Sequence, residues 1–314
     1  MSQADTAKLA ALGGPKTVPD GLLKKWPPID DTDRKMVMDS LESEKHAFGP
    51  NCKQFQEEFA AWNGNTYAIA TNSGTAALHM GIVASGCGVG DEVIVAAYSW
   101  SSSVTCILHH NCIPVFVDID FDTMNIDVDR IEAAITPKTR AVVVVHLHGL
   151  AVDMERVMAV ARRHNLKVIE DACQSHGALF KGRKVGTWGD CAAFSFNQNK
   201  CLCSGEGGMF VTDNEQMHED AKSLWSFGET RTPAEDRDYH VYAMGWMYRP
   251  NDLTAAFGRA QLTKLDGYLE TQKENARLMT EALQGTPHLI LPTEPEGHEH
   301  IWYNYTIRFD LAAL

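Results

Sequence analysis

The middle of the chain alternates short apolar runs, rich in β-branched residues, with helix-like segments, and no other feature restricts the fold as strongly. Consecutive parallel strands need a crossover connection, usually a helix, and a parallel sheet is buried on both faces. The alternation therefore predicts an α/β fold in which a mostly parallel sheet is flanked by helices. Seven strands are predicted: Tyr67–Thr71, Glu92–Ala97, Pro114–Ile119, Ala141–Leu147, Lys167–Asp171, Ala192–Phe196 and Gly208–Thr212.

The segments before and within this region differ in composition. Residues 1–50 contain too many prolines and glycines for a compact unit, so we predict an N-terminal arm with one helical pattern, Asp30 to Glu44. Residues 51–250 are predicted to form one large α/β domain. Its first helix is expected to start at Asn51 as N-cap and to run through Trp62.

Residues 251–314 are predicted to begin a smaller α+β domain. Two helices are expected at Asp252–Leu265 and Tyr268–Leu283, followed by a strand at Ile301–Phe309. The sequence stops before the further strands and helices that would bury this strand, so we expect the domain to be incomplete. The aromatic residues expected to stay exposed are Trp302, Tyr303 and Tyr305.

Composition excludes several classes of function. The net charge of −13 disfavours nucleic-acid binding, because such surfaces need clustered basic residues. No run approaches the roughly 20 apolar residues that span a bilayer, and the polar first residues resemble no signal peptide, so we expect a cytoplasmic protein. Eight cysteines indicate free thiols rather than a disulfide framework. Cys201 and Cys203 lack a second pair, so packing is favoured over a metal site and no metal is expected.

Lys200 is the most unusual residue of the sequence. It follows the strand Ala192–Phe196 and precedes a turn rich in glycine, Gly205 to Gly208, which would hold its amine among buried walls. Desolvating an ammonium costs several kcal/mol, so a buried lysine usually has a function. The leading one is Schiff-base formation, because burial lowers the pKa of the amine until it is nucleophilic. The alternative is an exposed loop lysine after a strand.

Other residues at strand ends complete a possible cofactor site. Ser73, Gly74 and Thr75 open a helix, so their amides and hydroxyls predict a phosphate site, although an ordinary N-cap explains them as well. Trp100 offers a flat face for an aromatic cofactor, or is a core residue. Asp171 ends a buried strand and needs a cation or donors, unless it caps a helix. With Lys200, and Ser195 as a further phosphate contact, these residues describe a site for pyridoxal 5'-phosphate.

Five motifs carry a resemblance to a known family. They are Asn72-Ser-Gly-Thr-Ala-Ala-Leu-His79, Glu170-Asp-Ala-Cys-Gln-Ser-His-Gly-Ala178, Phe194-Ser-Phe-Asn-Gln-Asn-Lys200, Gly205-Glu-Gly-Gly208 and Tyr248-Arg-Pro-Asn-Asp-Leu-Thr-Ala-Ala-Phe-Gly-Arg-Ala-Gln-Leu262. In order and spacing they resemble the DegT/DnrJ/EryC1/StrS family of sugar and cyclitol aminotransferases, which are pyridoxal phosphate enzymes of fold type I.

The resemblance implies a role for each candidate. Lys200 would be the Schiff-base lysine and general base, and Asp171 the partner of the pyridine nitrogen. Gln174 would lie beside the phenolic oxygen of the cofactor, and Trp100 on its ring. Asn251 would face the phosphate of the partner subunit, which implies a homodimer with shared active sites. The residues that would bind the phosphate in the same subunit are Ser73, Gly74, Thr75 and Ser195.

The resemblance also implies the reaction. An amino donor, L-glutamate or L-glutamine, would leave its nitrogen on the cofactor, and a keto-sugar, nucleotide-linked or free, or a keto-cyclitol would take it in a ping-pong reaction. The acceptor is expected to contact Phe48–Asn51 and Gly228–His240. The candidates for binding a diphosphate are Arg231, Arg237 and Arg249.

Three alternatives remain beside this reading. Some relatives dehydrate deoxy-keto-sugars and carry histidine at the lysine position, so Lys200 disfavours dehydration. An aminohydroxybenzoate-forming enzyme shares these motifs. A catalytically silent or truncated homologue with a binding or regulatory role would explain the early end of the sequence. His146 and His148 could face the pocket, although a core or rim position is favoured.

Overall fold

All seven predicted strands are present and form one sheet in the computed structural model, which describes residues 12–14, 16, 18–229 and 240–311. The strands are β1 (Tyr67–Thr71), β2 (Glu92–Ala96), β3 (Ile113–Val117), β4 (Thr139–Val145), β5 (Lys167–Asp171), β8 (Cys191–Ser195) and β9 (Gly208–Thr212). Their spatial order is β1-β9-β8-β5-β4-β2-β3. β9 is antiparallel to β1 and β8 on either side of it, and every other pair of adjacent strands is parallel. The predicted α/β fold with a mostly parallel sheet is therefore confirmed.

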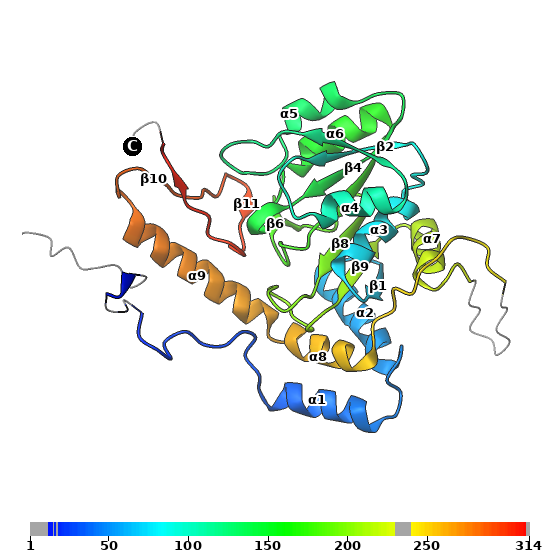
Figure 1. Cartoon of the computed structure of the whole chain (residues 1–314), viewed down its shortest axis with the longest axis horizontal. Helices are drawn as coiled ribbons and strands as arrows, with labels where there is room; N and C mark the ends of the chain where they lie inside the picture. Colours follow the sequence, from blue (N-terminus) through cyan, green and yellow to red (C-terminus); the bar gives the residue numbers. More distant parts are fainter. Residues whose placement is uncertain (1–11, 15, 17, 230–239, 312–314) are drawn as a thin grey trace, which may run out of the picture.

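Helices cover the sheet, and further helices, among them α9, extend beyond it (Figure 1). The helices are α1 (Asp31–Glu42), α2 (Pro50–Asn63), α3 (Gly74–Ala84), α4 (Ser102–His109), α5 (Val128–Ile131), α6 (Met154–His164), α7 (Glu215–Trp225), α8 (Asp252–Leu262) and α9 (Leu265–Leu283). Short strand pairs outside the sheet involve β6 (Leu179–Phe180), β7 (Arg183–Lys184), β10 (Leu289–Ile290), β11 (His298–Glu299) and β12 (Arg308–Phe309). The N-terminal arm runs past α9 and α8 and enters α1, which packs against α8.

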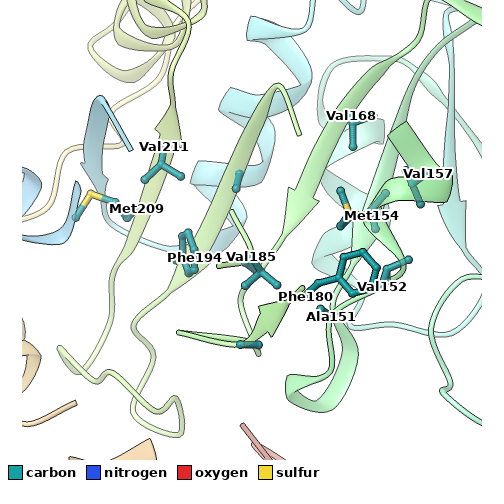
Figure 2. Packing of buried hydrophobic residues seen from close by; sticks show 14 of the residues in the cluster. Ala151, Val152, Met154, Val157, Val168, Phe180, Val185, Phe194, Met209 and Val211 are labelled. Atoms are coloured by element: carbon teal, nitrogen blue, oxygen red, sulfur yellow. The ribbon is translucent and has the colours of Figure 1, made fainter. Parts of the chain in front are cut away.

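The strands bury side chains on both faces of the sheet, because successive side chains of a strand point to opposite sides. Ile94 of β2 belongs to a buried cluster that includes residues of α2 and α6, whereas the next residue, Val95, belongs to a second cluster with α3, α4 and α7. Figure 2 shows part of the first cluster, with Phe194 of β8, Val168 of β5 and Met154 of α6. Helices therefore enclose the sheet from both sides, and its strand ends are left to form a site.

The predicted start of the second helix is wrong. Gly49 is the N-cap of α2, and Asn51 lies inside its first turn. The Asn51 amide instead donates to Asp252 Oδ2 over 2.7 Å, and its backbone N–H donates to Oδ1 over 2.8 Å. Asp252 has no exposed surface and also accepts from Ser40 Oγ at 2.8 Å. A buried carboxylate needs several donors, so this tertiary contact replaces the cap that the sequence pattern indicates.

The predicted strand Ile301–Phe309 is wrong over most of its length. Only Arg308–Phe309 is extended, and it pairs with β10. Trp302 has a φ of 57°, in the left-handed region that strands do not use. Strand-like composition is a weak signal here because burial against other elements decides the backbone of such a segment.

The aromatic residues of this segment are half-buried, which corrects the expectation that they stay exposed. Trp302 stacks on His300 with ring centroids 4.0 Å apart. The Tyr305 hydroxyl is hydrogen-bonded to Thr280 Oγ1 of α9 at 2.8 Å. Tyr303 lines the cavity described below.

No helix among the described residues has the length and apolar character needed to cross a membrane. The cytoplasmic location stays a prediction. The division of the chain at residues 50 and 250 also stays a prediction.

Candidate active site

A cavity of about 510 Å³ lies at the carboxyl ends of the parallel strands, where ligands gather in open α/β sheets. Residues within segments 73–75 after β1, 99–102 after β2, 171–174 at the end of β5 and 195–200 at the end of β8 line it. Tyr303 and Asn304, which lie far along the chain, close one side. The sheet order brings these separate loops to one place.

The N-terminus of α3 forms one wall of the cavity. The N–H groups of Gly74 and Thr75 occupy the first two helical positions, where no carbonyl of the same helix can accept from them. Ser73 is the N-cap, and its hydroxyl accepts from Ala76 N at 3.1 Å. The Thr75 hydroxyl is hydrogen-bonded to Ser102 Oγ at 2.8 Å. Amides and hydroxyls at a positive helix end are suited to an anion.

Gly74 is needed where α3 meets the end of β8. A Cβ at this position would lie 2.7 Å from Ser195 Cβ and 3.0 Å from Cys173 Sγ. Ordinary side chains do not approach so closely, so glycine allows the helix N-terminus to reach the Ser195 side of the cavity. The predicted phosphate residues therefore lie together.

Asp171 ends β5 on the floor of the cavity and is 4% exposed. Its Oδ2 accepts from Ser103 Oγ at 2.6 Å and its Oδ1 from Cys173 N at 3.2 Å. A carboxylate can accept about four hydrogen bonds, so capacity remains for a donor from a ligand. Burial and the neighbouring Asp171 raise the pKa of the Cys173 thiol well above its usual range, which keeps this thiol protonated.

Lys200 lies in the turn between β8 and β9 and lines the same cavity. Its side chain is half-buried rather than fully buried as predicted, because the turn opens onto the cavity. Its backbone N–H donates to Asn197 O at 2.9 Å. Its Nζ lies 5.0 Å from the ring centroid of Tyr303, within the range of a cation–π contact.

Two further predicted residues also line the cavity. Trp100 is 70% exposed and stands at its mouth. Gln174 Oε1 accepts from the N–H of His148 at 2.9 Å. The structure thus brings eight of the nine predicted site residues to one cavity: Ser73, Gly74, Thr75, Trp100, Asp171, Gln174, Ser195 and Lys200.

Asn251 does not line this cavity. It is the N-cap of α8, and its Oδ1 accepts from Thr254 N at 2.9 Å. It lines a separate hollow of about 620 Å³ together with Phe48, Asn72 and Arg249. Arg231 and Arg237, and most of the predicted acceptor loop, lie outside the described residues.

The predicted histidines are not part of the cavity lining. His146 is fully buried; its Nε2 is 2.9 Å from Glu170 Oε2. Glu170 in turn accepts the N–H groups of Gly186, Trp188 and Gly189, so this pair holds the loop after β7. His148 is 3.0 Å from Thr306 Oγ1. The favoured prediction, that these two histidines occupy core or rim positions, is therefore confirmed.

Sequence reasoning missed several residues of the cavity. Ser102 lines the cavity, and the buried Ser103 donates to Asp171. Both lie in the run Ser99 to Ser103 after β2, and a cluster of hydroxyls after a predicted strand was an available signal. Tyr303 and Asn304 had no such signal, because only tertiary packing brings them to Lys200. The remaining unpredicted lining residues that carry polar groups are Ser99, Cys173, Asn197, Asn199 and Glu206.

The donor set fits pyridoxal 5'-phosphate. Helix N–H groups and hydroxyls suit its phosphate, the Asp171 carboxylate suits a protonated ring nitrogen, and the Lys200 amine suits its aldehyde. A side chain at Gly74 would collide with Ser195 and Cys173, so glycine keeps the helix N-terminus and the Ser195 side of the cavity together. Among the described residues, no group of three or more histidine, cysteine or acidic side chains could hold a metal ion.

Curated relatives cover most of the chain. Spore coat polysaccharide biosynthesis protein SpsC of Bacillus subtilis is 39% identical, with 90% of this chain and 75% of that protein aligned. GDP-perosamine synthase of Caulobacter vibrioides is 38% identical, with 90% and 76% aligned. A putative L-glutamine:3-amino-2,3-dideoxy-scyllo-inosose aminotransferase of Micromonospora echinospora is 38% identical, with 98% and 74% aligned.

Solved structures share the fold. DesV of S. venezuelae is 33% identical with a TM-score of 0.84, covering 89% of this chain and 74% of that one. 3-Amino-5-hydroxybenzoic acid synthase is 30% identical with a TM-score of 0.87, covering 91% and 75%. The protein is thus a pyridoxal phosphate-dependent aminotransferase of fold type I. The profile of the DegT/DnrJ/EryC1/StrS aminotransferase family matches residues 27–313, and the chain belongs to that family.

We expect His79, on α3, to make the fold sensitive to acid. It is fully buried beside His109, the last residue of α4, and His110, its C-cap, and its Nδ1 is 2.9 Å from the Tyr248 hydroxyl. Burial and the charge of the two neighbouring imidazoles lower its pKa from 6.5 to about 4. Between these values the unfolded chain binds more protons than the folded one, so stability falls as the pH decreases through this window.

At about pH 4, the change at His79 alone should have lowered the free energy of unfolding by about 3 kcal/mol. Urea unfolding followed by fluorescence between pH 7 and about 4 should show it. His79→Gln should flatten the pH dependence, whereas the same change at the exposed His46 should leave it as in wild type. Equal slopes for wild type and His79→Gln would contradict the prediction. Burial also lowers the pKa values of His176 and His300 to about 3, so some acid sensitivity should remain.

Proposed function

We propose that the protein transfers an amino group from L-glutamate or L-glutamine to a keto-sugar, nucleotide-linked or free, or to a keto-cyclitol. The observation that carries the proposal is that Lys200, Asp171 and the α3 cradle lie around one cavity. The α3 cradle is the helix N-terminus formed by Ser73, Gly74 and Thr75. Relatives named for a nucleotide-linked amino sugar and for a cyclitol substrate, both 38% identical, support the acceptor class.

Each residue has a proposed task. The N–H groups of Gly74 and Thr75, with the hydroxyls of Thr75 and Ser195, hold the cofactor phosphate, while Asp171 accepts a hydrogen bond from the ring nitrogen. Lys200 Nζ takes a proton from the α-carbon of the amino donor. In the second half-reaction it delivers a proton to the acceptor carbon that receives nitrogen. Pyridoxal phosphate supplies an electron-accepting ring and a carbonyl group that exchanges amines.

The polar lining supports a polyhydroxylated acceptor. The cavity presents the side-chain amides of Asn199 and Asn304, the Ser99 hydroxyl and the Glu206 carboxylate beyond the residues assigned to the cofactor. Amides and a carboxylate can donate to and accept from neighbouring hydroxyl groups. A polar lining of this kind therefore favours a ligand that carries several hydroxyl groups.

We also propose a homodimer in which Asn251 reaches the cofactor phosphate of the partner subunit. Asn251 is exposed and lies outside the cavity of its own chain, in a hollow that shares Glu206 with that cavity. Subunit mixing tests this arrangement. Lys200→Ala and Asn251→Ala proteins, each impaired alone, should regain activity together, because one site of each hybrid has both residues. Mixtures no more active than their parts would oppose a shared site.

The function is tested in two half-reactions. The protein loaded with pyridoxal phosphate is first mixed with L-glutamine or L-glutamate, and formation of the pyridoxamine form is followed by absorbance. Nucleotide-linked keto-hexoses and scyllo-inosose are then added, and the aminated product is identified by mass spectrometry. We expect stoichiometric conversion in the first step and recovery of the aldehyde form with one acceptor class. If neither donor converts the cofactor, the proposal is wrong.

Formation of an aminohydroxybenzoate is the second candidate. The 3-amino-5-hydroxybenzoic acid synthase structure matches with a TM-score of 0.87, so this chain shares the fold of an enzyme with that activity in its name. The two functions differ in product. An aminated carbocyclic precursor that loses water would yield an aromatic product, visible by its ultraviolet absorbance, whereas sugar amination yields none.

A further inference from the structure

We propose that Trp26, in the N-terminal arm, is a positioning residue for Lys200. This inference rests on the proposed role of Lys200. The Trp26 indole N–H donates to the backbone carbonyl of Lys200 over 3.2 Å, although the two residues are 174 positions apart. The Gln198 amide donates to the carbonyl of Trp26 over 2.9 Å. The arm and the lysine turn are therefore joined by two reciprocal hydrogen bonds.

Trp26 is itself held by α8 and α9. Its ring meets Tyr268 of α9 edge to face, with ring centroids 5.0 Å apart and an interplanar angle of 67°. Two residues on, the Pro28 carbonyl accepts from the amide of Gln261 in α8 at 3.2 Å. Asp33, which is 2% exposed, accepts from Gln261 Nε2 at 2.7 Å and from Lys264 Nζ at 2.6 Å. The arm therefore connects α8 and α9 to the lysine turn through these contacts.

Lys200 is restrained at three points by different parts of the chain. Asn197 O accepts its N–H from within the turn, Trp26 donates to its carbonyl from the arm, and the Tyr303 ring lies 5.0 Å from its Nζ. The first two contacts fix the backbone from which the side chain starts. A long side chain amplifies small backbone shifts, and a misplacement of about 1 Å can cost about 10²-fold in rate.

The hydrogen bond of Trp26 to the lysine turn can be separated from its packing on Tyr268. The ring is 38% exposed, so its burial is modest, and we expect phenylalanine to keep the packing on Tyr268. Only the hydrogen bond to Lys200 needs the indole N–H. Trp26→Phe therefore separates the contact with the lysine turn from the packing of the arm.

The test compares Trp26→Phe with Trp188→Phe. Trp188 also donates its indole N–H to a backbone carbonyl, that of Arg183 at 3.4 Å, and does not line the cavity. In the apoprotein, we expect faster deuterium uptake over residues 197–204 in Trp26→Phe than in wild type and Trp188→Phe. In the loaded enzyme, kcat should fall about tenfold while KM for the donor changes less than about twofold. The pH titration of the Lys200-dependent absorption band should shift.

Gln198→Ala provides a second variant, because it removes the reciprocal bond and leaves the indole N–H in place. Its uptake over 197–204 should lie between those of wild type and Trp26→Phe. Unchanged deuterium uptake, titration and kcat in folded Trp26→Phe would overturn the proposal. The uptake measurement in the apoprotein does not depend on the reaction. A failure of the aminotransferase assignment, seen as donor inactivity of wild type, is therefore distinguishable from a failure of this inference.

Discussion

Lys200→Ala should lower kcat for amino transfer by at least about 10³-fold, the largest effect of any single change in the chain. In the proposed function the amine is both the covalent attachment of the cofactor and the group that moves the proton, and general acid–base catalysis alone contributes about 10²–10⁴-fold. The measurement is the rate of the donor half-reaction under single-turnover conditions. The absorption spectrum of the protein mixed with pyridoxal phosphate should also lose the band that depends on the lysine.

Lys184→Ala is the matched control for this experiment. Lys184 is also half-buried and lies over an aromatic ring, with Nζ 4.1 Å from the centroid of Trp62, but it does not line the cavity. Its replacement should leave the rate and spectrum of the half-reaction unchanged. A folded Lys200→Ala protein that keeps the wild-type band would show that Lys200 is not the attachment point of the cofactor, and the proposed role of this lysine would be wrong.

Asp171→Asn should lower kcat by about 10²–10³-fold while the protein still binds the cofactor. The change keeps the shape and the acceptor for Ser103 Oγ, which lies 2.6 Å from the carboxylate, but removes the negative charge. A preorganised charge beside the reacting group contributes on the order of 2.7–4 kcal/mol to the barrier, and the neutral amide no longer favours the protonated ring nitrogen. Steady-state kinetics with saturating donor and acceptor measure the loss.

Asp213→Asn is the control, because Asp213 also follows a strand of the sheet. That strand, β9, is antiparallel to its neighbours, so its end lies at the opposite edge from the cavity. The control should keep wild-type kcat. If Asp171→Asn stays within about threefold of wild type, the charge of this carboxylate has no part in the reaction.

The sheet and most of the cavity could be predicted because their signals are local. Strands of a sheet that is covered on both faces are mostly apolar, and three of the seven, Tyr67–Thr71, Lys167–Asp171 and Gly208–Thr212, have the predicted bounds. Parallel strands bring their carboxyl ends to one edge, so polar residues directly after β1, β2, β5 and β8 had to converge. The motif spacing added the roles that the resemblance implies.

The errors lie where contacts between distant segments override local patterns. Asn51 matches the pattern of an N-cap, yet its side-chain amide donates a hydrogen bond to the buried Asp252 carboxylate, 201 residues away. The run Ile301–Phe309 matches a strand, yet the Tyr305 hydroxyl is hydrogen-bonded to α9 and Tyr303 lines the cavity. A sequence pattern records the preference of a segment, whereas burial of a charge or a ring is satisfied by whichever partner the fold brings near.

The sequence alone determined the α/β class, the order of the strands along the chain and the identity of the lysine, carboxylate and cradle residues, because these depend on short-range periodicity and on chemistry carried by single motifs. Only the tertiary structure decided what surrounds them. The Tyr303 ring beside Lys200 Nζ, the Ser103 hydroxyl on Asp171 and the Trp26 indole on the lysine turn come from segments between 68 and 174 residues away. No local pattern specifies such contacts, since they form only when packing of the helices on the sheet places those segments together.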